Sequence, residues 1–332
     1  MDGAHSVNGR GGVISAIVPT IGRCESLTRL LCSLVAQSRR VDEVIIADGS
    51  GGSGVGLVVE DPRWGREGLL LKRVVVDPPH AVRQRVAAIA QARGTLLLLL
   101  DDDVELDREC VAEMERALYG HPGAVAVMAG FTNQTWSRPT RIWRWYMRWI
   151  LGVEKEGWEG RVMGPLLRFC FPDETRQVRR IEWIGAGNSM VARSAYDAAG
   201  GFSDFFLHRS TVNEDVDLGL KLGRTGVLLY CPSARLAHFH ASGGRVSTRA
   251  AAEDDLFNRY QILWKTCGRT EVESFRSCMT FWVLESLSNF LGALRRFSFR
   301  GSFQLFFGRT SAMRRIFKQT FRSRSRGAEK SG

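Results

Sequence analysis

Five consecutive leucines followed directly by three aspartates constrain this 332-residue chain more than any other segment. The leucines occupy residues 96–100, and the acids are Asp101, Asp102 and Asp103. An uninterrupted apolar run of this length is typical of a strand that is buried on both faces of a parallel sheet. Open α/β sheets bind their ligands at the carboxyl ends of such strands. Because crowded carboxylates repel one another unless a cation or proton lies between them, the segment predicts a divalent metal site.

A simpler interpretation of the acids is that one of them caps a helix beginning near Leu106 while the others are solvated. Capping requires one such residue and leaves two unexplained.

The chain around this segment alternates between strand and helix patterns. Short β-rich runs at 13–18, 43–47, 69–76 and 96–100 are separated by a helical pattern at 27–35, a glycine-rich loop at 51–56 and an alanine-rich helix at 82–92. This alternation predicts an α/β fold with a mostly parallel, twisted sheet flanked by helices. Further along, we expect a strand at 124–129, an irregular stretch at 131–180, a helix from Asn213 to Gly223, a strand at 227–231 and a helix at 250–265.

The net charge of +11 is concentrated in the C-terminal segment. Residues 295–332 hold eleven Lys and Arg against one acid, which gives +10 there and leaves +1 for the rest of the chain. The seven cysteines are scattered, with no CxxC pair, so they predict neither a zinc knuckle nor a disulfide framework. We expect a reduced compartment, and the glycine-containing start of the chain does not resemble a signal peptide.

Five segments in this order resemble a family 2 glycosyltransferase with the GT-A fold. The resemblance covers about residues 13–245 and implies an inverting transfer from a nucleotide-sugar donor, in which nucleoside diphosphate departs. UDP-sugars are the donor that we expect first. The segments are VISAIVPT at 13–20, ADGS at 47–50, LDDD at 100–103, GNSM at 187–190 with GGF at 200–202, and NEDVD at 213–217.

On the donor side, the resemblance implies that Asp101 and Asp103 hold Mg²⁺ or Mn²⁺ against the diphosphate, with Asp102 near the ribose or sugar. Alternate side chains of an extended segment point the same way, so Asp101 and Asp103 can share one ion. The cation would stabilise the charge that grows on the leaving group. A histidine after the last strand completes the metal or diphosphate site, and His238 matches that place better than His240.

Other donor-side residues are implied by the same resemblance. Asp48 accepts a hydrogen bond from the nucleotide base, or alternatively forms an Asx turn before Gly49. Arg85 faces the base or diphosphate, or alternatively is a solvated helix arginine. Pro19, Thr20 and Arg23 border the nucleotide. A flap at 242–248 closes over the donor.

On the acceptor side, the resemblance implies that Asp215 is the base that deprotonates the acceptor hydroxyl, supported by Glu214. The alternative makes Asn213 an N-cap, followed by favourable first-turn acids. We expect Asp217 to be structural.

The predicted organisation is a flexible tail (1–12), a nucleotide-sugar half (13–110), an acceptor half (111–250) and a helical basic-aromatic extension (251–332). The extension interleaves phenylalanines with its basic residues, and Trp143, Trp145 and Trp149 alternate with arginines. This composition predicts peripheral contact with an anionic membrane at the cytoplasmic face, and therefore a saccharide or lipid-linked saccharide acceptor. The alternative is that the aromatics pack on the catalytic domain. The run at 279–294 contains too many polar residues for a membrane span. Processive members of the family carry a QxxRW motif, which this sequence lacks, so we expect the transfer of one sugar per encounter.

Three other functions compete with this interpretation. A sugar nucleotidyltransferase shares the sheet but usually has a glycine-rich phosphate loop after its first strand, which residues 19–23 replace poorly. A nucleic-acid-binding protein would need its aromatics in a basic groove, whereas the acidic cluster repels phosphate, so we expect no nucleic acid. A non-catalytic scaffold need not retain all the acids.

Overall fold

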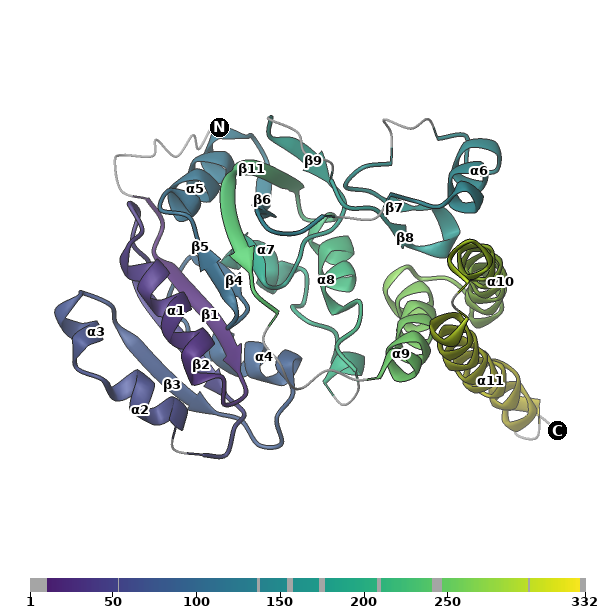
Figure 1. Cartoon of the computed structure of the whole chain (residues 1–332), viewed down its shortest axis with the longest axis horizontal. Coiled ribbons are helices and arrows are strands. Elements are labelled where there is room, and N and C mark those ends of the chain that lie inside the picture. Colours follow the sequence, from purple (N-terminus) through teal and green to yellow (C-terminus); the bar gives the residue numbers. More distant parts are fainter. Residues whose placement is uncertain are drawn as a thin grey trace.

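A computed structural model of the chain describes residues 11–52, 54–135, 138–153, 158–172, 177–207, 210–240, 247–297 and 299–328. Within these residues one large sheet forms the centre, in the strand order β3-β2-β1-β4-β10-β6-β11-β5, with β9 pairing to β11 (Figure 1). Its strands are β1 (Ile14–Thr20), β2 (Glu43–Asp48), β3 (Leu71–Val75), β4 (Leu96–Leu100), β5 (Val104–Leu106), β6 (Ala124–Phe131), β9 (Arg179–Ile181), β10 (Asn188–Ala192) and β11 (Val227–His238).

The leucine run forms a central strand with both faces covered, as predicted. Leu96, Leu98 and Leu100 pack into one core with helices α1 and α5, while Leu97 and Leu99 pack into the other with α4 and the C-terminal helices. The helices and turns before the C-terminal region are α1 (Cys24–Val35), α2 (Gly54–Glu60), α3 (Arg63–Arg66), α4 (Ala81–Gln91), α5 (Cys110–Gly120), α6 (Arg141–Trp149), α7 (Arg193–Ala198), α8 (Glu214–Leu222) and the 3-10 turns η2 (Gly164–Leu166) and η3 (Asp204–Phe206).

The strands β3, β2, β1 and β4 are mutually parallel, which confirms the predicted α/β sheet. Beyond β4 the direction changes, because β10 runs antiparallel to both β4 and β6. The carboxyl end of β4 therefore lies beside the amino end of β10. A small separate hairpin is formed by β7 (Val162–Met163) and β8 (Arg168–Phe169).

Three local predictions were wrong. The residues after the aspartates form β5 instead of a helix, because they pair with the end of β11, and helix α5 begins only at Cys110. The glycine-rich loop is shorter than predicted, since α2 begins at Gly54. Strand β11 continues to His238 past Pro232, with a register shift between Cys231 and Arg235 that accommodates the irregularity.

The C-terminal region is a helical layer at the far edge of the molecule from β3 (Figure 1). Helix α10 starts with a capping box in which Thr270 and Glu273 exchange hydrogen bonds, and α11 packs on α9 through Ala312, Met313 and Ile316. None of the described helices combines the length and hydropathy needed to cross a bilayer. The elements are α9 (Thr248–Gln261), the π-helical turn η4 (Ile262–Thr266), α10 (Glu271–Arg296) and α11 (Arg300–Ala328).

Candidate active site

The three aspartates that follow β4 each face a different cation or ring. The Asp101 carboxylate is 2.6 Å from Arg85, and that of Asp102 is 2.9 Å from Arg23. The Asp103 carboxylate is 3.0 Å from Nε2 of His238. This arrangement offsets the repulsion that the sequence predicted for crowded carboxylates.

Asp101, Asp103 and His238 offer one ligand atom each within 4.8 Å of one another, which makes them a candidate metal site. The convergence follows from the backbone: Asp101 and Asp103 are alternate residues, and β11 delivers His238 opposite Val104 of β5. A Cβ at Gly187 would lie 2.3 Å from the Asp101 carboxylate, so a larger residue there would displace this carboxylate from its present position. Among the described residues, the candidate metal group consists of Asp101, Asp103 and His238 and does not include His240.

Asp102 points the other way, toward the end of β1. It is buried and accepts hydrogen bonds from the Thr20 hydroxyl at 2.6 Å and from Arg23. Burial raises the pKa of Asp102, an effect that the hydrogen bond from Thr20 and the charge of Arg23 oppose. Thr20 and Arg23 therefore hold the aspartate segment against β1. The predicted roles of Asp102, Thr20 and Arg23 toward a nucleotide stay predictions.

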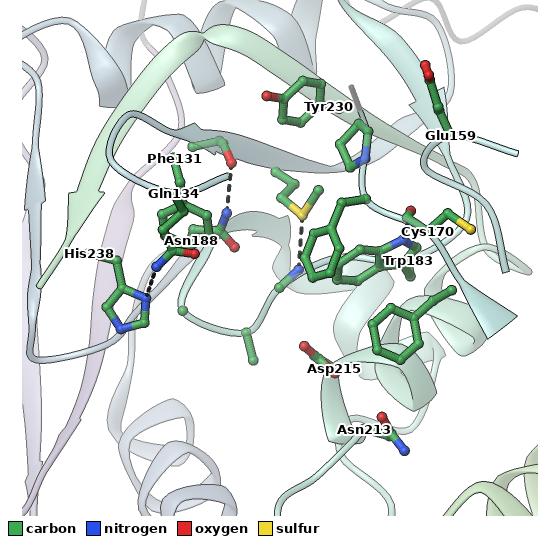
Figure 2. Close-up of a pocket in the computed structure, with 18 of the residues that line it drawn as sticks. Phe131, Gln134, Glu159, Cys170, Trp183, Asn188, Asn213, Asp215, Tyr230 and His238 are labelled. Atoms are coloured by element: carbon green, nitrogen blue, oxygen red, sulfur yellow. Dashed lines mark hydrogen bonds between the residues drawn. The ribbon is translucent and has the colours of Figure 1, made fainter. Parts of the chain in front are cut away.

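Gln134 is a site residue that the sequence did not indicate. Its amide nitrogen lies 2.9 Å from Nδ1 of His238 and 3.0 Å from Nε2 of His240 (Figure 2). Phe131 stacks on the His238 ring with the two centroids 5.5 Å apart. These contacts fix the imidazole so that its other nitrogen faces Asp103. No sequence signal could have found Gln134, because it lies in the irregular stretch where no spacing pattern applies.

Arg85 joins the two acidic groups of the chain. It is buried on α4, and its guanidinium is 2.6 Å from Asp101 and 3.1 Å from the Glu214 carboxylate. The alternative of a solvated helix arginine is therefore wrong. Burial lowers the pKa of Arg85, and the charges of Asp101 and Glu214 outweigh that effect, so its pKa is raised and it remains a cation.

Glu214 and Asp215 open helix α8 and line a cavity of about 1060 Å³. Burial raises the pKa of Glu214 to about 8, with a further rise from the charge of Asp215, and burial raises the pKa of Asp215 to about 6. The charged forms of both carboxyl groups are therefore disfavoured, and the pair takes up its full negative charge at a higher pH than free carboxyl groups do. Asn213 is at the N-cap position with Glu214 and Asp215 in the first turn, as the alternative predicted, but its side chain makes no capping hydrogen bond.

Asp217, which was expected to be structural, is fully buried and accepts a hydrogen bond from Ser203 at 2.6 Å and another from Thr266. These contacts tie α8 to η4, which confirms the expectation.

Asp48 ends β2 beside Thr20 of β1 and is fully buried. One carboxylate oxygen accepts from the Ser50 backbone at 2.8 Å, the Asx-turn contact, and the other is 2.6 Å from Arg73. Burial raises the pKa of Asp48, but the hydrogen bonds from Ser50 and Arg73 outweigh burial and hold the pKa below its usual value. Arg73 is a further residue that sequence reasoning missed. Pro19 lies in β1 opposite Ala47 of β2, and its predicted contact with a nucleotide is untested.

The cavity connects the two acidic groups. Its lining includes Asp101, His238 and His240 as well as Glu214 and Asp215. Figure 2 shows His238 and Asp215 together with Asn188, Tyr230 and Trp183 around this cavity. The geometry therefore places a candidate cation site and a candidate base around one space large enough for a substrate. The predicted flap at 242–248 cannot be assessed, because residues 241–246 lie outside the described part of the chain.

Three solved structures share this fold. GalNAc-T7 with UDP, GalNAc and Mn²⁺ is 12% identical with a TM-score of 0.55, and the match covers 77% of this chain and 50% of that one. S. aureus TarS 1–349 in complex with UDP-GlcNAc is 15% identical with a TM-score of 0.55 and coverage of 92% and 81%. The mannosyltransferase PcManGT from Pyrobaculum calidifontis, with GDP-Man and Mn²⁺, is 13% identical with a TM-score of 0.56 and coverage of 94% and 88%.

At these identities the likeness establishes the fold, and the predicted GT-A architecture is confirmed. The present chain spans half the length of the GalNAc-T7 chain that it matches. No curated protein matches the sequence.

The fold is that of GT-A glycosyltransferases. Residues 15–165 match the model of the family described as glycosyl transferase family 2, which confirms the predicted resemblance. The matched segment includes Asp101 and Asp103, whereas Glu214, Asp215 and His238 follow it. Mg²⁺ or Mn²⁺, the predicted cofactor, agrees with the Mn²⁺ in two of the solved relatives and with the Asp101, Asp103 and His238 group here.

Proposed function

We propose that the protein is a metal-dependent, inverting glycosyltransferase that moves one sugar from a nucleotide-sugar to a hydroxyl of a saccharide or lipid-linked saccharide. The observation that carries the proposal is the shared cavity, which Asp101 and His238 enter from the sheet and Asp215 enters from α8. A single displacement needs a cation for the leaving diphosphate and a base for the incoming hydroxyl at opposite ends of one space. We retain residues 13–110 as the donor half and 111–250 as the acceptor half.

Asp101, Asp103 and His238 would hold the ion, and an ion bound there would neutralise charge on the departing diphosphate. Two carboxylates and an imidazole suit Mn²⁺ better than Mg²⁺, which strongly prefers oxygen ligands. Arg85 stays charged between Asp101 and Glu214 and adds positive charge beside the same region.

Asp215 would accept the proton of the acceptor hydroxyl while that oxygen attacks the anomeric carbon from the side opposite the diphosphate. The raised pKa of Asp215, about 6, suits this task because a base works best with a pKa near the working pH. Glu214, which is next to the base and pairs with Arg85, would support Asp215 or hold the acceptor.

The donor test is a panel of UDP-, GDP- and dTDP-sugars with Mn²⁺, in which released nucleoside diphosphate is measured with and without added saccharides. UDP-sugars are the first choice, and the solved relatives hold both UDP-GlcNAc and GDP-Man. We expect diphosphate release that chelation abolishes. Pyrophosphate release from a sugar phosphate and a nucleoside triphosphate would instead favour the nucleotidyltransferase, and a protein that binds no donor would favour the scaffold.

We also propose that the enzyme docks peripherally on an anionic membrane at the cytoplasmic face. Helix α10 exposes an apolar stripe of residues three or four apart: Val283, Leu287, Phe290, Leu291 and Leu294 are each 43 to 51% exposed. Phe303 and Phe307 of α11 continue it, and α6 adds Trp145 and Trp149 between three arginines, with no acid in that helix. Apolar groups combined with cations fit an anionic lipid surface.

The alternative, that the aromatic residues pack on the rest of the chain, holds for some of them and not for others. Trp143 is buried on α6, whereas Phe297 at the turn between α10 and α11 is 91% exposed.

Vesicle sedimentation tests this docking. We expect binding to vesicles containing phosphatidylglycerol and little to phosphatidylcholine alone. Phe290→Glu with Leu294→Glu should reduce binding at least ~10-fold, since burying one such side chain is worth about 1.5–3 kcal/mol. Leu57→Glu on α2, an exposed apolar site at the other end of the molecule, is the matched control. The proposal would be overturned if the full chain did not bind anionic vesicles. It would also be overturned if the chain self-associated and the α10 substitutions abolished this self-association, because the stripe would then be an interface between copies.

A further inference from the structure

The short segment that delivers the acids of α8 has an unusual backbone and little regular structure. Residues 210–213 precede α8, and Asn213 adopts the left-handed conformation with φ of 71° immediately before Glu214. Because non-glycine residues rarely take this conformation, surrounding contacts must hold it. The capping bond that would ordinarily stabilise such a position is missing.

Helix α9 supplies the missing contacts. The Asn213 side-chain amide donates to Asp255 of α9, 2.9 Å from its carboxylate and 3.3 Å from its backbone carbonyl. One turn further, the amide of Asn258 donates to the backbone carbonyls of Ser210 and Val212 at 3.2 and 2.8 Å. Asn258 is 2% exposed, so its amide depends on these two carbonyls for hydrogen bonds.

Asp255 is itself fixed in place. Its carboxylate is 2.8 Å from Arg259 on the same helix, and the buried Arg259 guanidinium also donates to the backbone carbonyls of Leu166 and Leu167. Burial raises the pKa of Asp255, but the charge of Arg259 and the hydrogen bond from Asn213 outweigh burial, so its pKa is lowered and the group is ionised. An ionised acceptor strengthens the hydrogen bond that it receives from Asn213.

We infer that Asp255 and Asn258 are positioning residues that hold residues 210–213 so that Glu214 and Asp215 face the cavity. The catalytic consequence rests on the proposed function, whereas the structural consequence does not. Misplacement of a reacting group by about 1 Å can reduce turnover by about 100-fold, so loosening this segment should affect catalysis without touching the metal group.

Amide hydrogen exchange over residues 210–218 tests the structural part, with the intact chain and no substrate. Asn258→Ala removes both hydrogen bonds to the loop. Asn213→Gly removes the amide and keeps a residue that tolerates positive φ. Loss of one such hydrogen bond should raise exchange about 3- to 10-fold. Glu253→Gln is the control, because Glu253 is on the same helix but pairs with Arg315 of α11 at 3.1 Å.

Kinetics test the catalytic part, with diphosphate release from the donor that the panel identifies. We expect Asn258→Ala and Asn213→Gly to lower kcat at least ~10-fold while Mn²⁺ affinity and donor KM stay within about 2-fold. Asp255→Asn combined with Asn213→Gly should cost no more than the larger single effect, because both act through one contact.

Unchanged exchange at residues 210–218 in Asn258→Ala would overturn the inference whether or not the protein transfers sugar. Faster exchange with unchanged kcat would also overturn the positioning role. If the unsubstituted protein turned over no donor while Asn258→Ala still exchanged faster, the proposed function would be contradicted and the structural role of α9 would stand.

Discussion

The two acidic groups of the cavity are held by different parts of the molecule. Asp101 and Asp103 follow a strand in the middle of the sheet, and their positions depend on β1, β5 and β11, which are fixed by strand pairing. Glu214 and Asp215 follow a segment with no strand partner and depend on side-chain contacts from α9. The first group is built by the sheet itself, and the second by helices outside it.

Under the proposed function, the first group serves the donor and the second serves the acceptor. A site at the end of a central strand is determined by the topology that the solved relatives share. A site that depends on a C-terminal helical layer can change with that layer. We therefore expect the donor group to withstand changes in α9–α11 and the acceptor group to be sensitive to them.

The largest effect should follow Asp215→Asn, which removes the proposed base and nearly preserves shape. Turnover should fall ~10²–10⁴-fold, the usual contribution of general base catalysis, while Mn²⁺ binding stays unchanged. Kinetic assays and paramagnetic resonance of bound Mn²⁺ would check both. Weakened Mn²⁺ binding would instead show that the two groups are coupled, for which Arg85, in contact with both, offers a route.

Asp103→Asn should act on the other group. We expect at least ~100-fold loss of turnover together with weakened Mn²⁺ binding, because an amide lacks the charge of the ligand. Asp107→Asn is the control, a half-exposed acid four residues away that pairs with Arg235. An Asp103→Asn protein with full activity and unchanged Mn²⁺ affinity would contradict the metal assignment.

The pH dependence should be set by the α8 acids. Since the pKa of Asp215 is raised to about 6, kcat should rise through pH 6, well above the range of an ordinary aspartate. A folded state with raised carboxyl pKa values binds more protons than the unfolded state, so between about pH 4 and 8 these groups lower stability as pH rises. Denaturant unfolding at pH 5 and 8 should therefore show a smaller loss in a Glu214→Gln, Asp215→Asn protein than in the parent.

The smallest effect should distinguish two glycines of α11. A Cβ at Gly308 would lie 2.2 Å from the Arg249 carbonyl of α9, whereas one at Gly301 meets nothing within 4 Å. Gly308→Ala should destabilise the protein by about 1–3 kcal/mol and lower turnover through α9. Gly301→Ala should stabilise by up to ~1 kcal/mol, because alanine favours helix. Thermal unfolding of the two variants would measure both effects. Equal shifts in Tm would contradict the role of α11 as a support of α9.

Local sequence patterns carried the prediction of the sheet and the donor group. The leucine run at 96–100 is apolar on both faces, so only a covered central strand can accommodate it, and Asp101 and Asp103 share an orientation because strand side chains alternate. The helix predicted to start near Leu106 starts only at Cys110, because residues 104–106 pair with β11 instead. Gln134 and Arg73 could not be predicted, since their partners are 104 and 25 residues away.

The sequence by itself determined which residue types meet at the end of β4, because periodicity and chain direction are local properties. The tertiary structure decided which cation faces each acid, and that α9 holds Asn213 before the α8 acids. Those outcomes depend on contacts between segments distant in sequence, such as the 42 residues between Asn213 and Asp255, which no local pattern records.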